Sequence, residues 1–297
     1  GNLNLPGRPP HVCFLPASPR CPVTAQTPTR SDPAVIPFEK RRFRAAALHY
    51  LEGRPAYAPG LIDRLVQLTG LGPDGRVLDL GCGPGQLALA LAPHAGEVVA
   101  VDPEPEMLRI AGENAAAAGL KIRFVEGSSA DIGPELGRFH LAVMGRSFHW
   151  MDRPRTLERL DGLIEPGGAV ALLRTRNPEL PENAWAAAFD AVIERYAVDD
   201  QARRQRKSPG WLRHEAILLD SPFSHVEFIA VLERRRRPLE RFIDRALSLS
   251  STSATKIGAR TADLAAELRA ALAPFAVEGM IGEVVESGAT IAWRPAG

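Results

Sequence analysis

An acid and three glycines recur at every second position in one stretch of this 297-residue chain: Asp79, Gly81, Gly83 and Gly85. The apolar run 77–80 predicts a buried strand, and 86–92 has the apolar spacing of a helix. A strand, a glycine turn and a helix in this order place a ligand at the strand's carboxyl end, against the helix N-terminus. Glycine suits such a turn because a Cβ would block a ligand lying on the backbone, and because the turn often needs a positive φ.

A second acid follows at the spacing that a nucleoside ligand requires. The run 97–102 predicts another buried strand, and it ends in Asp102, about twenty residues past the glycines. At that distance a carboxylate can accept both hydrogens of a ribose diol. The alternative is a glycine turn that binds nothing, and the combination of acid, glycines and Asp102 disfavours it. The sequence therefore predicts a ligand of the adenosine type.

Two classes of adenosine cofactor compete for this turn. Nicotinamide cofactors favour the pattern G-x-G-x-x-G, and here Gln86 stands at its third glycine. The pattern Asp79-x-Gly81-x-Gly83-x-Gly85 instead resembles motif I of the class I S-adenosylmethionine (SAM) methyltransferases. An acid suits SAM, which carries an ammonium and a sulfonium and no pyrophosphate. The resemblance implies that SAM, and its product S-adenosylhomocysteine, bind here to Asp79, Gly81, Cys82, Gly83, Gly85 and Asp102.

Composition places few limits on the partner. Hydrophobic residues make up 45% and charged residues 24%, as in ordinary soluble globular proteins. The net charge of +1 provides no field that favours nucleic acid or an anionic membrane. Cys13, Cys21 and Cys82 lack metal-site spacing, so we expect no metal, and we expect no membrane span because no apolar run reaches roughly 18 residues. We expect a cytoplasmic protein, as monomer or homodimer.

The chain divides into three parts. Residues 1–36 are rich in proline and lack an acid before Asp32, which predicts a flexible N-terminal arm. Residues 37–176 form the predicted SAM-binding core, and 177–297 the cap helices plus closing strands of the same sheet. Strands that alternate with helices indicate a doubly wound α/β fold. The resemblance implies a Rossmann-like, mostly parallel seven-stranded sheet with an antiparallel last strand and a helical cap.

The predicted elements follow hydrophobic periodicity. Strands are expected at 77–80, 98–102, 122–126, 141–144, 169–173, 225–233 and 283–294. Helices are expected at 38–51, 60–70, 86–92, 105–118, 156–163, 183–196, 238–249 and 261–272. Residues 211–221 stay undecided between these classes.

Two further segments resemble parts of the family. The segment 50–57 is similar to the one before motif I in trans-aconitate and UbiE-like methyltransferases, where tyrosine and arginine close over the cofactor's methionine end. That implies Tyr50 and Arg54 at the cofactor carboxylate, which an arginine fork suits, and Tyr57 in the substrate pocket. The segment 127–131 resembles the one that contacts adenine, which implies a role for Ala130 and Asp131. A surface turn with a structural arginine, and an Asx turn, are the respective alternatives.

The segment after the predicted strand 141–144 carries the candidate catalytic residue. The family commonly has an aromatic-His-Trp sequence beside the transferable methyl group, and this chain has Phe148, His149 and Trp150. An imidazole with its usual pKa near 6.5 could act as a general base, and Trp150 could meet the sulfonium through a cation–π contact. Arg146 stands where a neutral residue is usual. If it faces the pocket it favours an acidic or phenolate acceptor, and otherwise it is a salt-bridged arginine.

These residues favour a SAM-dependent methyltransferase that acts on oxygen or nitrogen of a small organic molecule. Carbon is the less favoured acceptor atom, and a bacterial secondary metabolite is one candidate acceptor. An RNA methyltransferase is an alternative because of the basic runs 203–207 and 234–237. Those runs lack interleaved aromatic residues, which favours a solvated strand end and disfavours nucleic acid. A protein that binds SAM without catalysis is the other alternative.

Overall fold

A computed structural model describes residues 36, 47–199 and 201–295 of the chain. Of the predicted arm at 1–36 only Ile36 is described, and the predicted helix 38–51 is described from Ala47 onward. The described residues all belong to one compact unit, which spans 33–297.

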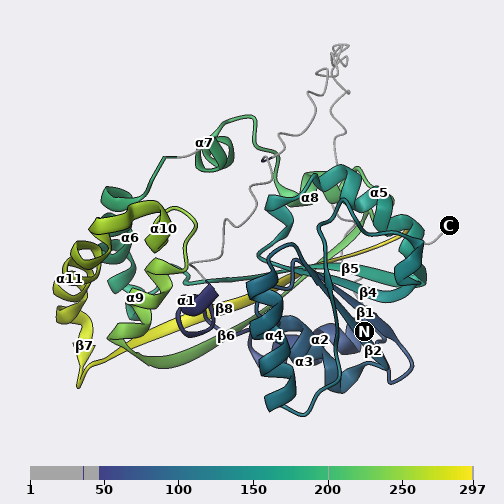
Figure 1. Cartoon of the computed structure of the whole chain (residues 1–297), viewed down its shortest axis with the longest axis horizontal. Coiled ribbons are helices and arrows are strands. Elements are labelled where there is room, and N and C mark those ends of the chain that lie inside the picture. The colour runs from purple at the N-terminus through teal and green to yellow at the C-terminus, as the bar shows by residue number, and fades with distance from the viewer. Residues whose placement is uncertain (1–35, 37–46, 200, 296–297) are drawn as a thin grey trace, which may run out of the picture. The chain divides into compact units, whose positions relative to one another are not determined.

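The strands form one sheet in the order β3-β2-β1-β4-β5-β8-β6, with the two-residue β7 paired to β8 (Figure 1). They are β1 Arg76–Leu80, β2 Glu97–Asp102, β3 Arg123–Glu126, β4 Phe139–Gly145, β5 Ile164–Arg176, β6 His225–Pro238, β7 Ala276–Val277 and β8 Met280–Trp293. Strands β1 to β5 are mutually parallel, and β8 runs antiparallel between β5 and β6. The predicted mostly parallel sheet with an antiparallel last strand is confirmed, and only the short β7 has no counterpart among the seven predicted strands.

Helices cover both faces of the sheet. They are α1 Ala47–Gly53, α2 Pro59–Thr69, α3 Gln86–Leu91, α4 Pro105–Ala117, α5 Arg153–Leu163, α6 Trp185–Tyr196, α7 Gln201–Lys207, α8 His214–Leu219, α9 Leu239–Leu247, α10 Ala254–Ile257 and α11 Thr261–Leu272. Side chains of α2 and α3 share one apolar cluster with Val77 and Leu141, and those of α5 and α8 share another with Leu78 and Ala142. Because successive strand residues face opposite sides, these clusters lie on opposite faces, as a doubly wound sheet requires.

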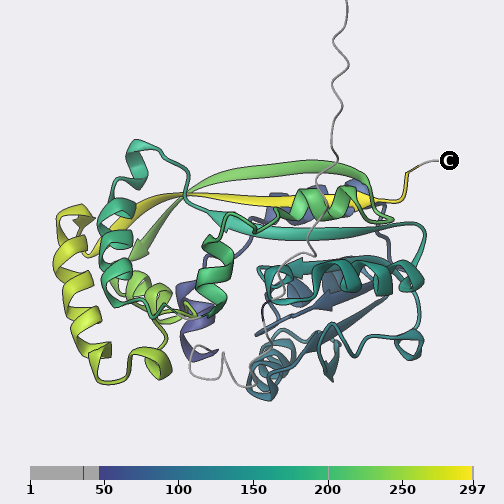
Figure 2. The ribbon, with the colours of Figure 1, turned by 90° about the horizontal axis from the view of Figure 1, so that it is seen from above.

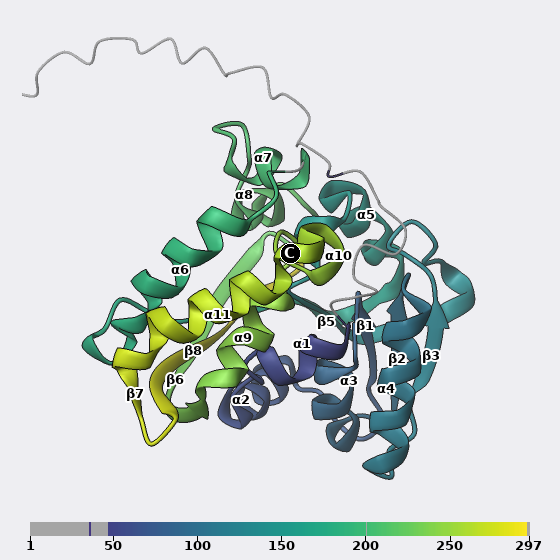
Figure 3. The same cartoon turned by 60° about the vertical axis from the view of Figure 1, so that its left-hand side comes forward.

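The strands β6 and β8 extend well beyond the core strands. Each has 14 residues, roughly 45 Å of chain, whereas β1 has five. Their far ends carry a separate apolar cluster in which α6, α9 and α11 pack through residues such as Trp185, Phe242 and Leu268 (Figures 2 and 3). These helices form the cap that the sequence predicts, and the strands join it to the core.

Buried charges fasten the cap strands to neighbouring segments. The Glu283 carboxylate of β8 is almost fully buried, accepts a hydrogen bond from Asn177 at 3.1 Å, and lies 3.8 and 3.9 Å from Arg237 and Arg245. Because a buried charge is costly without partners, these contacts fix where β8 meets the cap.

The sequence favoured a solvated strand end for the arginine run at the end of β6. The structure shows that two of these arginines bind backbone carbonyls of a neighbouring segment. Arg235 donates to the carbonyl of Ala56 at 2.9 Å, and Arg237 donates to the carbonyl of Gly53 at 3.2 Å. Arg234 meanwhile pairs with Glu182. The run therefore holds the segment that joins α1 and α2, and this segment carries Arg54 and Tyr57.

Close backbone contact between α1 and α9 gives a test of this arrangement. A Cβ added at Gly53 would lie 2.4 Å from backbone atoms of Asp244 and Arg245. We expect Gly53→Ala to lower the free energy of unfolding by about 1–3 kcal/mol, as overpacking does, when measured by urea denaturation. Gly72→Ala is the matched control, because a Cβ there has no neighbour within 4 Å. Equal stability of the two variants would contradict the close contact.

Candidate active site

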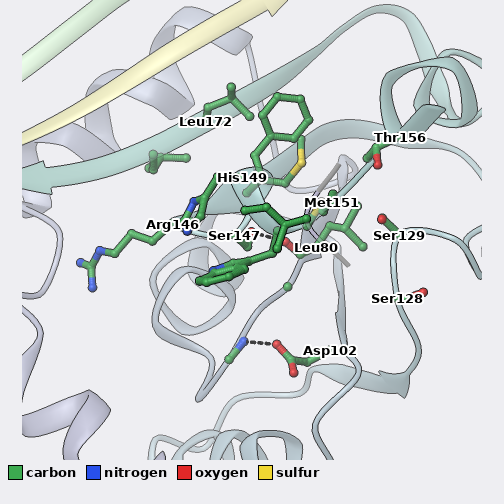
Figure 4. A pocket seen from close by; sticks show the side chains of 18 of the residues that line it. Leu80, Asp102, Ser128, Ser129, Arg146, Ser147, His149, Met151, Thr156 and Leu172 are labelled. Carbon is green, nitrogen blue, oxygen red and sulfur yellow. Dashed lines mark hydrogen bonds between the residues drawn. The ribbon is translucent and has the colours of Figure 1, made fainter. Parts of the chain in front are cut away.

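A cavity of about 870 Å³ lies at the carboxyl ends of the parallel strands (Figure 4). Leu80, Asp102, Gly145 and Leu173 line it from β1, β2, β4 and β5. Further walls come from helices α1, α4, α5, α7 and α8, from β8, from the loops after β2, β3 and β4, and from the turn 249–251. This is the edge at which doubly wound sheets bind their ligands.

The glycine turn exposes backbone to this cavity. Gly81, Gly83 and Gly85 all have positive φ, at 70°, 55° and 87°. A Cβ at Gly81 would come within 2.6 Å of the Ser147 side chain, whereas a Cβ at Gly83 would have no protein neighbour within 4 Å. Gly83 thus presents open backbone to the cavity that it lines, while Gly85 packs against Ala111 and does not line it.

The two acids of the motif have different roles. Asp102 lines the cavity, and its carboxylate oxygens accept hydrogen bonds from the backbone N–H of Glu104 and Gly83 at 2.9 and 2.8 Å. Burial raises the pKa of Asp102 to about 6. Asp79 lies behind the turn, outside the lining, and accepts from the N–H of Ala88 at 2.9 Å. Burial raises the pKa of Asp79 to about 7, and its Oδ1 has no hydrogen-bond partner.

The loop after β3 is held together by its own acid. Asp131 accepts hydrogen bonds from the backbone N–H and the hydroxyl of Ser128 at 2.8 and 2.6 Å. This is the local turn that the sequence left as an alternative. Ser128 and Ala130 line the cavity, but Asp131 does not. The loop presents backbone and small side chains to the cavity, while the exposed Asp131 carboxylate is bound to Ser128.

Two arginines form one wall. The Arg54 guanidinium lies 5.6 Å from the Tyr50 ring and donates to the carbonyl of Ser248. The Arg146 guanidinium lies 4.7 Å from the Tyr57 ring and donates to the carbonyl of Pro55 at 2.6 Å. Nε of Arg54 and both Nε and Nη1 of Arg146 are buried without a hydrogen-bond partner.

The predicted catalytic segment forms a short turn of 3-10 helix, Phe148–Trp150, after β4. The rings of His149 and Trp150 lie 4.7 Å apart, and the Arg206 guanidinium lies 4.5 Å above Trp150. Burial, and then the positive charge of Arg206, lowers the pKa of His149 well below its usual range. His149 is therefore neutral at physiological pH.

A second histidine, His214 of α8, lines the cavity and is contacted by the buried Arg153. Arg153 is 1% exposed, stacks 3.9 Å from Trp211, and donates to the carbonyl of Leu212. It also lies 3.2 Å from Nδ1 of His214, which must accept because an arginine can only donate. Burial lowers the pKa of His214 to about 4.

The cavity gathers most of the predicted site residues. Those that line it are Tyr50, Arg54, Gly81, Gly83, Asp102, Ala130, Arg146, Phe148, His149 and Trp150. Those that do not are Tyr57, Asp79, Cys82, Gly85 and Asp131. Cys82 is buried under the turn, and burial raises the pKa of its thiol well above the usual range, so it acts as a small packing residue.

Several lining residues were not predicted, among them Ser147, Arg206, His214, Ser250 and Thr290. Ser147 lies two residues after the end of β4, and its hydroxyl donates to the carbonyl of Leu80. It could have been chosen for its place at a strand end. Arg206 and His214 come from cap segments without a local motif, so only the fold shows that they reach the cavity.

Comparison with known proteins agrees with this geometry. Residues 77–168 match the family described as a methyltransferase domain. An uncharacterized methyltransferase of Mycobacterium bovis is 32% identical over 154 residues, which cover 52% of this chain and 59% of that protein. A demethylmenaquinone methyltransferase of Thermus thermophilus is 33% identical over 123 residues, covering 40% and 55%. The match to these relatives spans little more than half of their length.

A solved structure shows the same fold over more of the chain. The YjhP protein of Escherichia coli superposes with a TM-score of 0.50 and 17% identity, covering 85% of this chain and all of that one. At that identity the likeness concerns the fold alone. The sequence match at residues 77–168 is to a methyltransferase domain, and this likeness in fold agrees with that match.

Across 47–199 and 201–295, no three His, Cys, Asp or Glu side chains come together in a way that could hold a metal ion. Within the same ranges, every helix is too short or too polar to cross a membrane.

The two cavity histidines give a prediction for solution. We expect imidazole NMR signals of His149 and His214 to stay those of neutral rings from pH 8 down to pH 6, since burial opposes their charged form. The Nδ1 of His214 should show the shift of an acceptor nitrogen. The variants His149→Asn and His214→Asn assign the signals. A ring that is protonated at pH 6 in the folded protein would contradict this environment.

Proposed function

We propose that this protein is a SAM-dependent methyltransferase that acts on a small organic acceptor. The observation that supports this most is the Asp102 carboxylate. It is fixed by the N–H groups of Gly83 and Glu104 and lines the cavity next to the open backbone of Gly83. A carboxylate held in this way is oriented to accept hydrogen bonds from a ribose diol. The methyltransferase domain at 77–168 supports the same function.

The residues present fit the cofactor. The space beside Gly83 admits a ligand that any Cβ would displace, and Asp79 places a carboxyl group with an unpartnered Oδ1 under the turn. In our proposal Asp102 holds the ribose, the backbone of 81–83 supports the methionine part, and 127–130 contacts adenine. Asp131 then acts through the loop that it stabilises. Asp79, Cys82 and Gly85 shape the turn from beneath.

The methionine end would meet the arginine wall. Arg54 is the candidate for the cofactor carboxylate, because its Nε is buried without a partner and Tyr50 packs beside it. Tyr57 supports Arg146 from outside the cavity, so its part in the substrate pocket is indirect. Phe148 and Trp150 supply apolar wall next to His149.

When bound, SAM supplies a methyl group that is already electrophilic. The chain's own residues then have to orient the acceptor and exclude water, which is worth up to ~7–11 kcal/mol of the barrier. His149 is neutral, as a general base must be before it takes a proton. The cations around it oppose that protonation, so the role of His149 as a base stays a prediction.

The structure bears on the RNA methyltransferase alternative but not on that of a non-catalytic SAM-binding protein. The run 234–237 is engaged with Glu182 and with carbonyls of the α1–α2 segment, which leaves little of it for an RNA backbone. A protein that binds SAM without catalysis has the same cofactor site, and only transfer of the methyl group separates the two. Cytoplasmic location and a monomeric or homodimeric state stay predictions.

Removal of the Asp102 carboxylate, which is proposed to bind the ribose, tests the cofactor site. We expect Asp102→Ala to weaken binding of S-adenosylhomocysteine by about 10–100-fold, because hydrogen bonds to a charged group contribute about 1.5–3 kcal/mol. Isothermal titration calorimetry measures this. Asp74→Ala, at an exposed position, is the control and should bind like the wild type. Absence of binding heat in the wild type would remove the proposed function.

The same carboxylate predicts a pH dependence. A diol donates to the ionised form of Asp102, whose pKa is about 6 without ligand, so binding lowers that pKa. Affinity should be full above pH 7 and fall by up to about tenfold per pH unit below pH 6. Asp79 also titrates near 7, and comparison with Asp102→Asn isolates the contribution of Asp102. An affinity that rises as the pH falls would contradict this assignment.

A further inference from the structure

Acids and arginines line different parts of the cavity. Asp102 and Glu104 line it at the end of β2, and Arg54, Arg146 and Arg206 line it from the segment after α1, the end of β4 and α7. Arg155, Arg159 and Arg174 also line it, and Arg159 donates to the carbonyl of Ser129. Figure 4 shows Arg146 extending to the side of His149 away from Asp102, Ser128 and Ser129. Asp102 therefore suits the ribose, and Arg54 and Arg146 bring positive charge to a different part of the lining.

Positive charge surrounds the ring of His149. Each of the charged groups that act on its ring carries or can carry a positive charge: Arg206, His214, Arg54 and Arg153. The two other acids of the lining are already paired with arginines, Asp152 with Arg155 at 3.6 Å and Glu215 with Arg213 at 3.3 Å. The place beside His149 thus favours a negatively charged occupant.

Arg54 and Arg146 supply the strongest indication. Within the described part of the chain, both donate only to backbone carbonyls, neither forms an ion pair, and three of their nitrogens are buried without a partner. Buried donors without partners destabilise a protein, and charged ones do so more strongly. Arg146 also has a φ of 58°, a conformation that side chains of this size rarely adopt. Such strain is retained where it directs a functional side chain.

The cofactor alone does not balance these charges. SAM carries one carboxylate against an ammonium and a sulfonium. A carboxylate held by Arg54 leaves Arg146 without a counterion, and the sulfonium adds further positive charge near the turn. An acceptor that brings its own negative charge would balance both. The lining around it includes Met144, Phe148, Trp150, Leu172 and Leu249, which suit an apolar body.

We propose, on the basis of the proposed function, that the acceptor is a small organic acid whose anionic oxygen lies against Arg146 and is itself methylated. A lone pair of that oxygen forms the bond to the methyl carbon. The carbon–sulfur bond breaks, and its electron pair stays on sulfur. Anion and sulfonium become a neutral methylated product and a neutral thioether sulfur, and no proton is transferred. The step therefore needs no general base, in agreement with cations that oppose protonation of His149.

The test uses the full chain, SAM labelled in its methyl group, and a bacterial metabolite extract. The extract is divided by anion exchange at about pH 11, where carboxylates and phenolates are both ionised, into an anionic and an unretained fraction. We expect label to enter the anionic fraction. Alkaline treatment distinguishes the two sources of an anionic oxygen, because methyl esters of carboxylates release labelled methanol and methyl ethers of phenolates do not. Absence of label from the anionic fraction, or preferential labelling of the unretained one, overturns the proposal.

Variants of Arg146 connect the result to this residue. We expect Arg146→Gln to raise the apparent KM for the anionic fraction at least tenfold, with the affinity for S-adenosylhomocysteine changed less than twofold. Arg146→Lys, which keeps the charge, should recover part of the loss. Arg123→Gln, at an exposed position on β3, is the control and should behave as wild type.

Two readouts keep this proposal separate from the proposed function. If S-adenosylhomocysteine fails to bind the wild type, the proposed function itself fails. If it binds, but Arg146→Gln weakens it as much as it raises the KM, Arg146 serves the cofactor and the acceptor assignment is overturned. An unchanged KM in Arg146→Gln overturns it as well.

Discussion

The site depends on one carboxylate that joins two strand ends. Asp102 closes β2 and accepts from the N–H of Gly83, in the turn that follows β1, and from the N–H of Glu104. Both strands belong to the parallel centre of the sheet, so the bond fixes the turn against its neighbour. Burial of this charge is unfavourable, as its raised pKa shows, and backbone donors offset part of the cost. The left-handed glycines let the turn follow this path and leave its surface open.

The centre of the fold could be predicted because its signals are local. The strand, turn, helix and strand from β1 to β2 lie within thirty residues, and each has its own periodicity or breaker. The place of Asp102 was predicted for the same reason. Asp131 shows the limit, since family resemblance marks its segment, but only coordinates show its carboxylate engaged with Ser128. Arg206 and His214 reach the cavity from cap segments, through long-range contacts that no local pattern contains.

Arginines in this chain either hold a neighbouring segment in place or line the cavity. At the end of β6, Arg235 and Arg237 bind carbonyls of the segment between α1 and α2 and so hold it on the sheet. That segment carries Arg54, and Arg146 in turn donates to its Pro55. A basic run that resembles a nucleic-acid surface in the sequence thus supports the wall of the cavity. The net charge of a segment does not distinguish arginines that bind nucleic acid from arginines that bind the protein's own backbone carbonyls, because the sequence does not show which carbonyls lie nearby.

The pairing of β6 with β8 has a mechanical consequence. The ladder between them is continuous over all 14 positions, from His225 with Trp293 to Pro238 with Met280, and β8 is also bonded to β5. A hinge within these strands would break many backbone hydrogen bonds at once, so we expect the strands to move as one rigid element. Of the segments that line the cavity, α7 and the turn 249–251 lie outside the sheet, so they can move without breaking this ladder.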